Sequence, residues 1–270
     1  MRYTRQLAIM AVTTGIAAAL SAPAHAADAR VSILHAVPGA TVDVYANGDA
    51  ILEDFKPGTL TDPLTLPEGS YDLKVTAAGA GPDGAAVIEA NDVAVPGGAN
   101  VTVVAHLSAS GTPALTPFVN DTAPTKAGQA RITVRHTAAA PAVDVRADGE
   151  VAFVNLTNPK EDKADLAAGS VAADVVLAGT DTVAIGPADV DLKEGTNTIV
   201  YAWGSAADDN LELAVQTITG LHSAPAGVPS GSGGQASDSS WMSFGIPGAA
   251  ALLVAGAALA LTRRREEVRA

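Results

Sequence analysis

Short stretches in which hydrophobic and polar residues alternate occur repeatedly between positions 29 and 218. The stretches VSILH at 31–35, SYDLKVT at 70–76 and NVTVVAH at 100–106 all follow a period of two. That period is typical of β-strands with one face buried and one face exposed. No segment away from the two termini has the 3.6-residue period of an amphipathic helix. We therefore expect half-buried strands throughout this part of the chain.

The pattern returns 101 residues later. The segment VSILHAVPGATVDVYANG at 31–48 is matched by ITVRHTAAAPAVDVRADG at 132–149. LPEGSYDLKV at 66–75 is matched by LAAGSVAADV at 166–175, and VPGGANVTVV at 95–104 by LKEGTNTIVY at 192–201. Three blocks in the same order indicate duplication of a unit of roughly 90 residues, the size of a small domain.

The turns within the units favour a particular fold. Asn47-Gly48 and Asp148-Gly149 have the composition of two-residue type I′ hairpin turns. Each unit has room for about seven short strands, which is typical of a β-sandwich. The fold class predicted for the exported part is all-β, with two tandem antiparallel, immunoglobulin-like β-sandwich domains.

Both ends of the chain predict targeting segments. Residues 1–26 have a basic start, an apolar core and the small-residue exit Ala24-His25-Ala26, as in a cleaved signal peptide. Near the other end, 244–262 is apolar and just long enough for a transmembrane helix. The anchor residues expected there are Trp241 and Phe244 at the membrane interface and the cluster Arg263, Arg264 and Arg265 on the cytoplasmic side.

A cell-wall sorting signal is the alternative reading of this end, but it needs an LPxTG-like pentapeptide before the apolar run, and the sequence has none there. The resulting division has seven parts. They are a signal peptide at 1–26, a first sandwich at 29–118, a linker at 119–129, a second sandwich at 130–219, a Gly/Ser/Pro-rich stalk at 220–243, a transmembrane helix at 244–262 and a cytoplasmic basic tail at 263–270.

Charge and cysteine content narrow the possible functions. The segment 27–240 carries 27 acidic and 10 basic residues, and a surface of that sign repels nucleic acid. The chain contains no cysteine, which excludes disulfides, thiolate catalysis and cysteine-ligated zinc or iron–sulfur centres. No motif predicts a cofactor.

One polar pair recurs in both units and is the candidate for chemistry. His35 and Asp43 are repeated as His136 and Asp144 with the same spacing. Such a pair could orient a general base or bind a ligand, but no nucleophile repeats beside it. A structural hydrogen-bonding role would equally leave a duplicated pair, and we favour that role. We predict no metal site, although Asp208-Asp209-Asn210 has oxygen ligands of the kind that calcium takes.

These blocks also resemble a known family. A strand ending in His-Ala, followed by Pro-Gly, VDVY and a glycine turn, and later by LPEGSYDLKV and VPGGANVTVVAHL, is similar to the DUF4397 domain. The resemblance implies a secreted or surface bacterial protein, of a kind that often carries tandem copies and has no established activity. The second unit departs from the pattern, since Ala139-Ala140 replaces Pro38-Gly39 and Val171 replaces Tyr71.

The layout of the chain predicts a non-catalytic protein of the cell membrane, with its two sandwiches outside and its C-terminus in the cytoplasm. Duplicated domains on a stalk offer reach and bivalency, which favours binding of a protein or a cell-envelope polymer. Two alternatives stay open. One is an extracytoplasmic enzyme that uses the His/Asp site, and the other is a passive structural spacer of the envelope.

Overall fold

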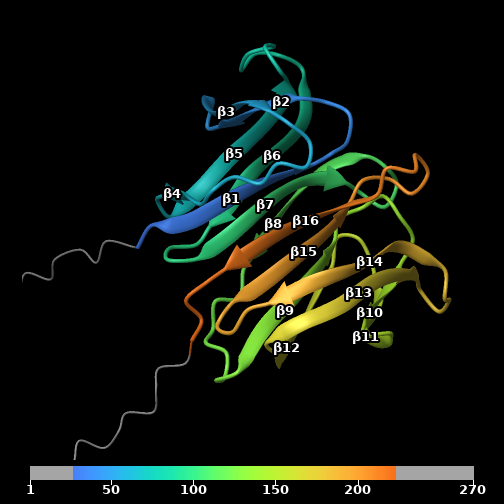
Figure 1. Cartoon of the computed structure of the whole chain (residues 1–270). Coiled ribbons are helices and arrows are strands. Elements are labelled where there is room, and N and C mark those ends of the chain that lie inside the picture. The colour runs from blue at the N-terminus through green and yellow to red at the C-terminus, as the bar shows by residue number, and fades with distance from the viewer. Residues whose placement is uncertain (1–26, 223–270) are drawn as a thin grey trace, which may run out of the picture. The chain divides into compact units, whose positions relative to one another are not determined.

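The computed structural model describes residues 27–222, and all of its regular elements are strands (Figure 1). The all-β prediction is therefore confirmed for this part of the chain, which contains no helix. We call the first eight strands repeat 1. They are β1 (Ala29–Ala36), β2 (Val42–Ala46), β3 (Asp49–Phe55), β4 (Leu64–Leu66), β5 (Gly69–Ala77), β6 (Ala86–Val95), β7 (Asn100–Leu107) and β8 (Pro113–Val119).

The next eight strands form repeat 2. They are β9 (Gln129–His136), β10 (Val143–Ala147), β11 (Glu150–Leu156), β12 (Glu161–Ala167), β13 (Gly169–Leu177), β14 (Val183–Leu192), β15 (Asn197–Trp203) and β16 (Glu212–Ile218). The sheet orders of the two repeats are the same. Repeat 1 has sheets β4-β1-β7-β8 and β3-β2-β5-β6, and repeat 2 has β12-β9-β15-β16 and β11-β10-β13-β14.

The prediction of purely antiparallel sheets is wrong at one pair in each repeat. β1 pairs in parallel with β7, and β9 with β15. Hairpin reasoning finds only neighbours joined by a short turn, which must be antiparallel. The strands between β1 and β7 include a whole sheet on the opposite side of the core. β7 therefore begins at the same end of the sheet as β1 and runs in the same direction, so the two strands pair in parallel.

The predicted hairpin turns are confirmed. Asn47 and Gly48 both have positive φ, at 52° and 88°, and Asp148 and Gly149 have 51° and 82°. The pairing of Ala46 with Asp49 leaves only these two residues in the first loop. Two successive positive φ angles define a type I′ turn, whose twist matches that of the flanking strands.

Each repeat buries an aliphatic core between its two sheets. In repeat 1, Val31 and Val103 from one sheet pack with Leu73 and Val95 from the other. The corresponding core of repeat 2 contains Ile132 from β9 together with residues of β10, β11, β13 and β14. The two sheets of each repeat therefore lie face to face, with one hydrophobic layer between them.

A further hydrophobic cluster joins the two repeats. It contains Leu34, Val104 and Phe118 from repeat 1 and Ile199 and Tyr201 from repeat 2. β1, β7, β9 and β15 are consequently buried on both faces. The expectation of half-buried strands is wrong for β1, where Ser32 and Leu34 are 1% and 0% exposed. It is correct for β5, where Leu73 and Val75 are buried and Ser70 and Asp72 are exposed.

The connection between the repeats, 119–129, is held by several hydrogen bonds. The amide of Thr125 donates to the carbonyl of Leu221 at 2.7 Å, and the side-chain amide of Asn197 donates to the carbonyl of Asp121 at 3.1 Å. This segment thus contacts both the start of β15 and the chain that follows β16.

Leu34→Ala tests whether the cluster between the repeats stabilises the fold. Removing this fully buried side chain should lower the free energy of unfolding by about 2–5 kcal/mol, because the transfer free energy of the removed atoms is lost and a cavity is left behind. Denaturant unfolding of the full chain measures the change. Val154→Ala, at a side chain that is 71% exposed, is the control and should cost below about 0.5 kcal/mol. Equal effects of the two substitutions would contradict the packing described here.

Candidate functional site

His35 stands at the end of β1 and closes the turn that leads to β2. Its Nε2 lies 2.8 Å from the carbonyl oxygen of Ala40, and the amide of Val37 donates to Nδ1 at 3.4 Å. A carbonyl can only accept, so Nε2 carries the proton and Nδ1 is the acceptor. Burial lowers the pKa of His35, which keeps the ring neutral. Both ring nitrogens are therefore engaged by the backbone of one turn.

Asp43 stands on β2 and connects three segments of repeat 1. Its Oδ1 accepts from the amide of Asp54 at 2.9 Å, and its Oδ2 accepts from the amide of Gly79 at 2.8 Å. Asp54 has a positive φ of 52°, at the irregularity in the β2–β3 pairing. The carboxylate thus supplies acceptors that the interrupted ladder lacks. Within residues 27–222 no hydrogen bond joins Asp43 to His35.

Repeat 2 reproduces the aspartate arrangement in full and the histidine arrangement in part, since Nδ1 of His136 has no hydrogen-bond partner among the described residues. The Nε2 of His136 lies 2.9 Å from the carbonyl oxygen of Pro141. The two carboxylate oxygens of Asp144 accept from the amides of Asn155 and Gly179, at 2.7 and 2.8 Å. These two donors lower the pKa of Asp144. The aspartates therefore hold the strand irregularity in the same way in both repeats, and the histidines share the contact of Nε2 with a turn carbonyl.

Residues 29–146 match the model of the DUF4397 family, a domain of unknown function. The DUF4397 match begins at β1, spans all of repeat 1 and ends within β10. The predicted family is thus confirmed for this region, and a second DUF4397 copy stays a prediction. A search of curated proteins finds no match to the chain.

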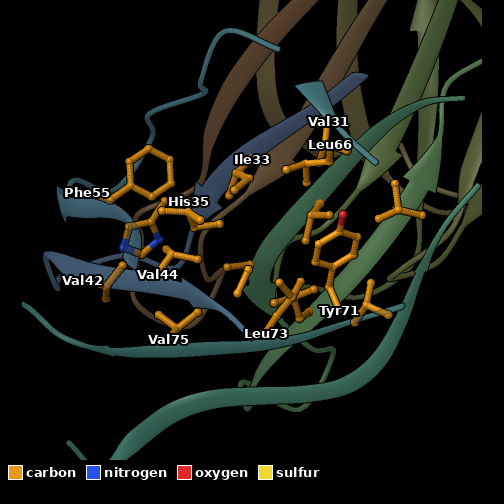
Figure 2. A pocket seen from close by; sticks show the side chains of 17 residues that line it. Val31, Ile33, His35, Val42, Val44, Phe55, Leu66, Tyr71, Leu73 and Val75 are labelled. Atoms are coloured by element: carbon orange, nitrogen blue, oxygen red, sulfur yellow. The ribbon is translucent and has the colours of Figure 1, made fainter. Parts of the chain in front are cut away.

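The core of the DUF4397 region contains a small space between its two sheets (Figure 2). Val31, Ile33 and His35 of β1 point into it, and Phe55 lies beside the imidazole with ring centroids 5.7 Å apart. The space measures about 30 Å³. That volume is close to the share of one water molecule in liquid water, so it is part of the packed core and not a ligand site.

A chain of buried polar groups crosses the junction between the repeats. The Arg135 guanidinium donates to Glu161 at 2.7 Å and to the Tyr201 hydroxyl at 2.7 Å. Tyr201 in turn donates to Gln216 Oε1 at 2.6 Å. The same Oε1 accepts from the hydroxyl of Thr102, in repeat 1, at 2.9 Å. Arg135 is only 1% exposed, so its charge depends on these partners.

Aromatic rings complete the surroundings of Arg135. The guanidinium carbon lies 4.4 Å from the ring centre of Phe118, in repeat 1, and 5.3 Å from that of Tyr201. Both distances are within the range of a cation–π interaction. Burial also raises the pKa of Tyr201, so its hydroxyl keeps the proton that it donates.

Two buried histidines lie at another part of the same junction. His106 of β7 makes contacts of 2.8 Å from Nδ1 to the carbonyl of Leu107 and from Nε2 to the hydroxyl of Thr116. Burial lowers the pKa of His106, and the nearby His136 lowers it further. Burial lowers the pKa of His136 as well. Protonating both rings would place two positive charges in a dry interface.

Arg131, on β9, forms ion pairs with two carboxylates. It contacts Asp165 across the β9–β12 pair and Asp121 from the inter-repeat connection, each at 2.8 Å. Lys163 also contacts Asp121, at 2.6 Å, and this hydrogen bond is the main reason why the pKa of Asp121 is lowered. The site around Arg131 is therefore filled by two carboxylates.

The equivalent position in repeat 1 is Arg30, which lines an open polar cleft of about 590 Å³. The cleft lies between β1 and the loop before β4 on one side and β16 and the residues after it on the other. Ser32 and Gln216 are buried lining residues, and Asp62 and Thr219 also line the cleft. A volume in this range is typical of small-molecule sites.

The sequence did not predict the residues of the cleft, or those of the buried polar chain, as site residues. Arg30 and Arg131 are 101 positions apart, as are His35 and His136, so the repeat itself was a signal for them. Their surroundings depend on residues from the opposite repeat, which local spacing does not reveal. The predicted site residues His35, Asp43, His136 and Asp144 bond to backbone groups of their own repeat, and within residues 27–222 no hydrogen bond joins a histidine to its aspartate.

Several expectations concern residues that lie outside the described part. These are the signal peptide at 1–26, the transmembrane helix at 244–262 and the anchor residues Trp241, Phe244, Arg263, Arg264 and Arg265. Within residues 27–222, the structure has no helix with the length and apolar character needed to cross a bilayer. No cluster of three or more histidine or acidic side chains placed to hold a metal occurs in this same range.

Asp43→Asn should destabilise the fold. An amide has one acceptor oxygen, so one of the two backbone donors would lose its partner, at a cost of about 1–3 kcal/mol. The free energy of unfolding in denaturant measures the loss. Asp54→Asn is a matched control, because Asp54 is exposed and asparagine also tolerates positive φ. A stability unchanged by Asp43→Asn would contradict the structural role.

Stability should fall on mild acidification, because His35, His106 and His136 all have pKa values lowered from 6.5. Below about pH 6.5 the unfolded chain binds protons that the folded chain does not. The histidine contribution is therefore complete above that pH and is lost as pH falls through the lowered values. Calorimetry between pH 7.5 and 5 should show a decreasing melting temperature.

His106→Gln tests whether the His106 ring contributes to the loss of stability between pH 7.5 and 5. The variant should flatten the pH dependence by up to about 1.4 kcal/mol per pH unit, the slope that one proton contributes. His222→Gln is the control, because His222 is an exposed residue at the end of the described part. A slope that does not change in His106→Gln would exclude this ring as a source of the acid sensitivity.

Proposed function

We propose that this chain is a non-catalytic protein of the cell membrane that presents two DUF4397-like, immunoglobulin-like sandwiches outside the cell to bind a protein or an envelope polymer. The sandwiches would be residues 29–118 and 130–219, with 119–129 as their connection. The proposed transmembrane helix is 244–262, and 220–243 would be the stalk that separates it from the sandwiches. The predicted signal peptide and the charge of the tail support this orientation.

The hydrogen bonds of the two His/Asp pairs support a non-catalytic role for the protein. In both repeats Nε2 of the histidine and both oxygens of the aspartate are occupied by backbone groups of turns. A general base needs a nitrogen or oxygen directed at a substrate proton. The duplicated histidines and aspartates therefore support the fold. This favours ligand binding over catalysis as the role of the polar surface.

The observation that favours binding over a passive spacer is the open cleft at the junction of the repeats. A spacer requires only a stable fold, whereas this cleft gathers charged, hydroxyl and amide side chains from both repeats around one space. Polar groups that converge in a concave site are typical of ligand recognition.

Crosslinking on intact cells tests this function. A membrane-impermeant amine crosslinker is added to cells that make the full-length chain with an affinity tag, and the captured material is identified. One dominant, saturable protein or polymer is the expected result, because the lysines of the sandwiches would face the medium. Crosslinking only after the cells are permeabilised would contradict the orientation, and efficient self-labelling with no enriched partner would favour the spacer.

A further inference from the structure

The internal duplication provides a comparison between two equivalent arginines. Arg30 pairs with Asn100 across the parallel β1–β7 ladder, and Arg131 pairs with Asn197 across β9–β15. The two arginines therefore hold equivalent positions in the parallel ladders, although β4 pairs with β1 over a shorter stretch than β12 with β9. Their side-chain surroundings differ, since Arg131 is buried among carboxylates and Arg30 is exposed.

The first difference between the two arginines is the residue that lies opposite each of them on the neighbouring antiparallel strand. Arg131 lies opposite Asp165 in the β9–β12 pair and makes a two-point contact with it, at 2.8 Å from Nε and 3.0 Å from Nη2. Arg30 lies opposite Thr65 in the β1–β4 pair. A threonine at this position has neither the charge nor the reach of the aspartate.

The second carboxylate is lost in the segment that comes from the opposite repeat. Asp121 follows the end of β8 by two residues and contacts Arg131 at 2.8 Å. The registers of β7–β8 and β15–β16 make Thr219 its equivalent after β16. Thr219 lines the cleft beside Arg30. Within the described residues Arg30 makes no ion pair, and the position equivalent to Asp121 is occupied by a threonine that lines the cleft.

Hydrogen bonds hold one lining residue of the cleft, Gln216, in place. The Tyr201 hydroxyl accepts from Arg135 and the Thr102 hydroxyl accepts from Asn120, so both hydroxyl protons are free to go to Gln216 Oε1. This fixes the orientation of the Gln216 amide. Its nitrogen makes no hydrogen bond in the described residues, and Gln216 lines the cleft.

We propose that the cleft beside Arg30 binds the carboxylate of a small sugar acid. Arginine recognises carboxylates through two parallel N–H donors, which is the contact that Arg131 makes with Asp165. The Gln216 amide and the hydroxyl of Ser32 add donors, and Asp62 offers an acceptor for ligand hydroxyls. The acidic surface of the protein disfavours polyanions, so a single carboxylate on a neutral, hydroxylated body fits best.

This assignment rests on the proposed binding function and names its site and ligand class. The probe is D-glucuronate, and D-glucose is the matched control because it has the same ring hydroxyls without the carboxylate. Saturation-transfer NMR on the full-length protein in detergent micelles reports binding of both. We expect glucuronate to saturate with a Kd of about 1 mM or lower, and glucose to bind at least about tenfold more weakly.

Three variants separate the site from the rest of the surface. Arg30→Gln should weaken glucuronate binding at least about tenfold without changing the melting temperature, because the Arg30 side chain has no partner within residues 27–222. Thr219→Asp should also block binding and should leave the melting temperature equal or higher, since it restores the pair that Asp121 makes in the other repeat. Lys126→Gln removes an exposed positive charge elsewhere and should leave binding unchanged.

The proposal is overturned if glucuronate shows no saturation up to about 10 mM, if glucose binds as well, or if Arg30→Gln binds within twofold of the original chain. An aspartate-containing peptide that binds as tightly as glucuronate would overturn the assignment to sugar acids. If glucuronate does not bind but a partner is still captured on intact cells, the sugar-acid assignment is wrong and the proposed binding function is retained. Failure of both would remove the binding function itself.

Discussion

The structure depends on keeping the charge of Arg135 inside the junction between the two repeats. A guanidinium that is 1% exposed is unfavourable unless its donors and its faces are satisfied. Repeat 2 supplies Glu161 and the hydroxyl of Tyr201, and repeat 1 supplies the ring of Phe118. Neither repeat satisfies this cation alone. Burial of this cation at the junction therefore uses hydrogen-bond partners from repeat 2 and an aromatic face from repeat 1, next to the hydrophobic cluster around Leu34.

The duplication explains how one framework supports two different arginine environments. Arg131 has aspartates opposite it in β12 and after β8, where Arg30 has Thr65 and Thr219, while the strand order and the register at the two arginines are the same. The same divergence is visible where β7 ends in His106-Leu107 and β15 ends in Trp203. The indole of Trp203 packs close to Gly58 of the other repeat, whereas His106 is bonded within its own sheet. Duplicate positions thus keep the backbone role and change the side-chain role.

Much of the fold could be predicted from the sequence because its determinants are local. The period of two, the Asn47-Gly48 and Asp148-Gly149 turns and the return of the pattern after 101 residues are all readable in single segments. The parallel pairing of β1 with β7 was not predicted, since those strands are far apart in sequence and share no turn. The burial of Ser32 and Leu34 was also missed, because only the second repeat covers that face.

The candidate site shows the same limit. The spacing of His35 and Asp43 drew attention, yet their bonds go to backbone groups that no spacing rule identifies. Arg30 and Gln216 contribute to the cleft from opposite repeats, so neither is unusual within its own segment. Sequence reasoning recognises groups that one turn brings together, and it misses groups that are brought together by packing of two copies.

The hydrophobic outer face of repeat 1 makes the two repeats dependent on each other. Leu34, Val104 and Phe118 on this face pack against Ile199 and Tyr201 of repeat 2. A chain that lost either repeat would carry an uncovered, aggregation-prone sheet.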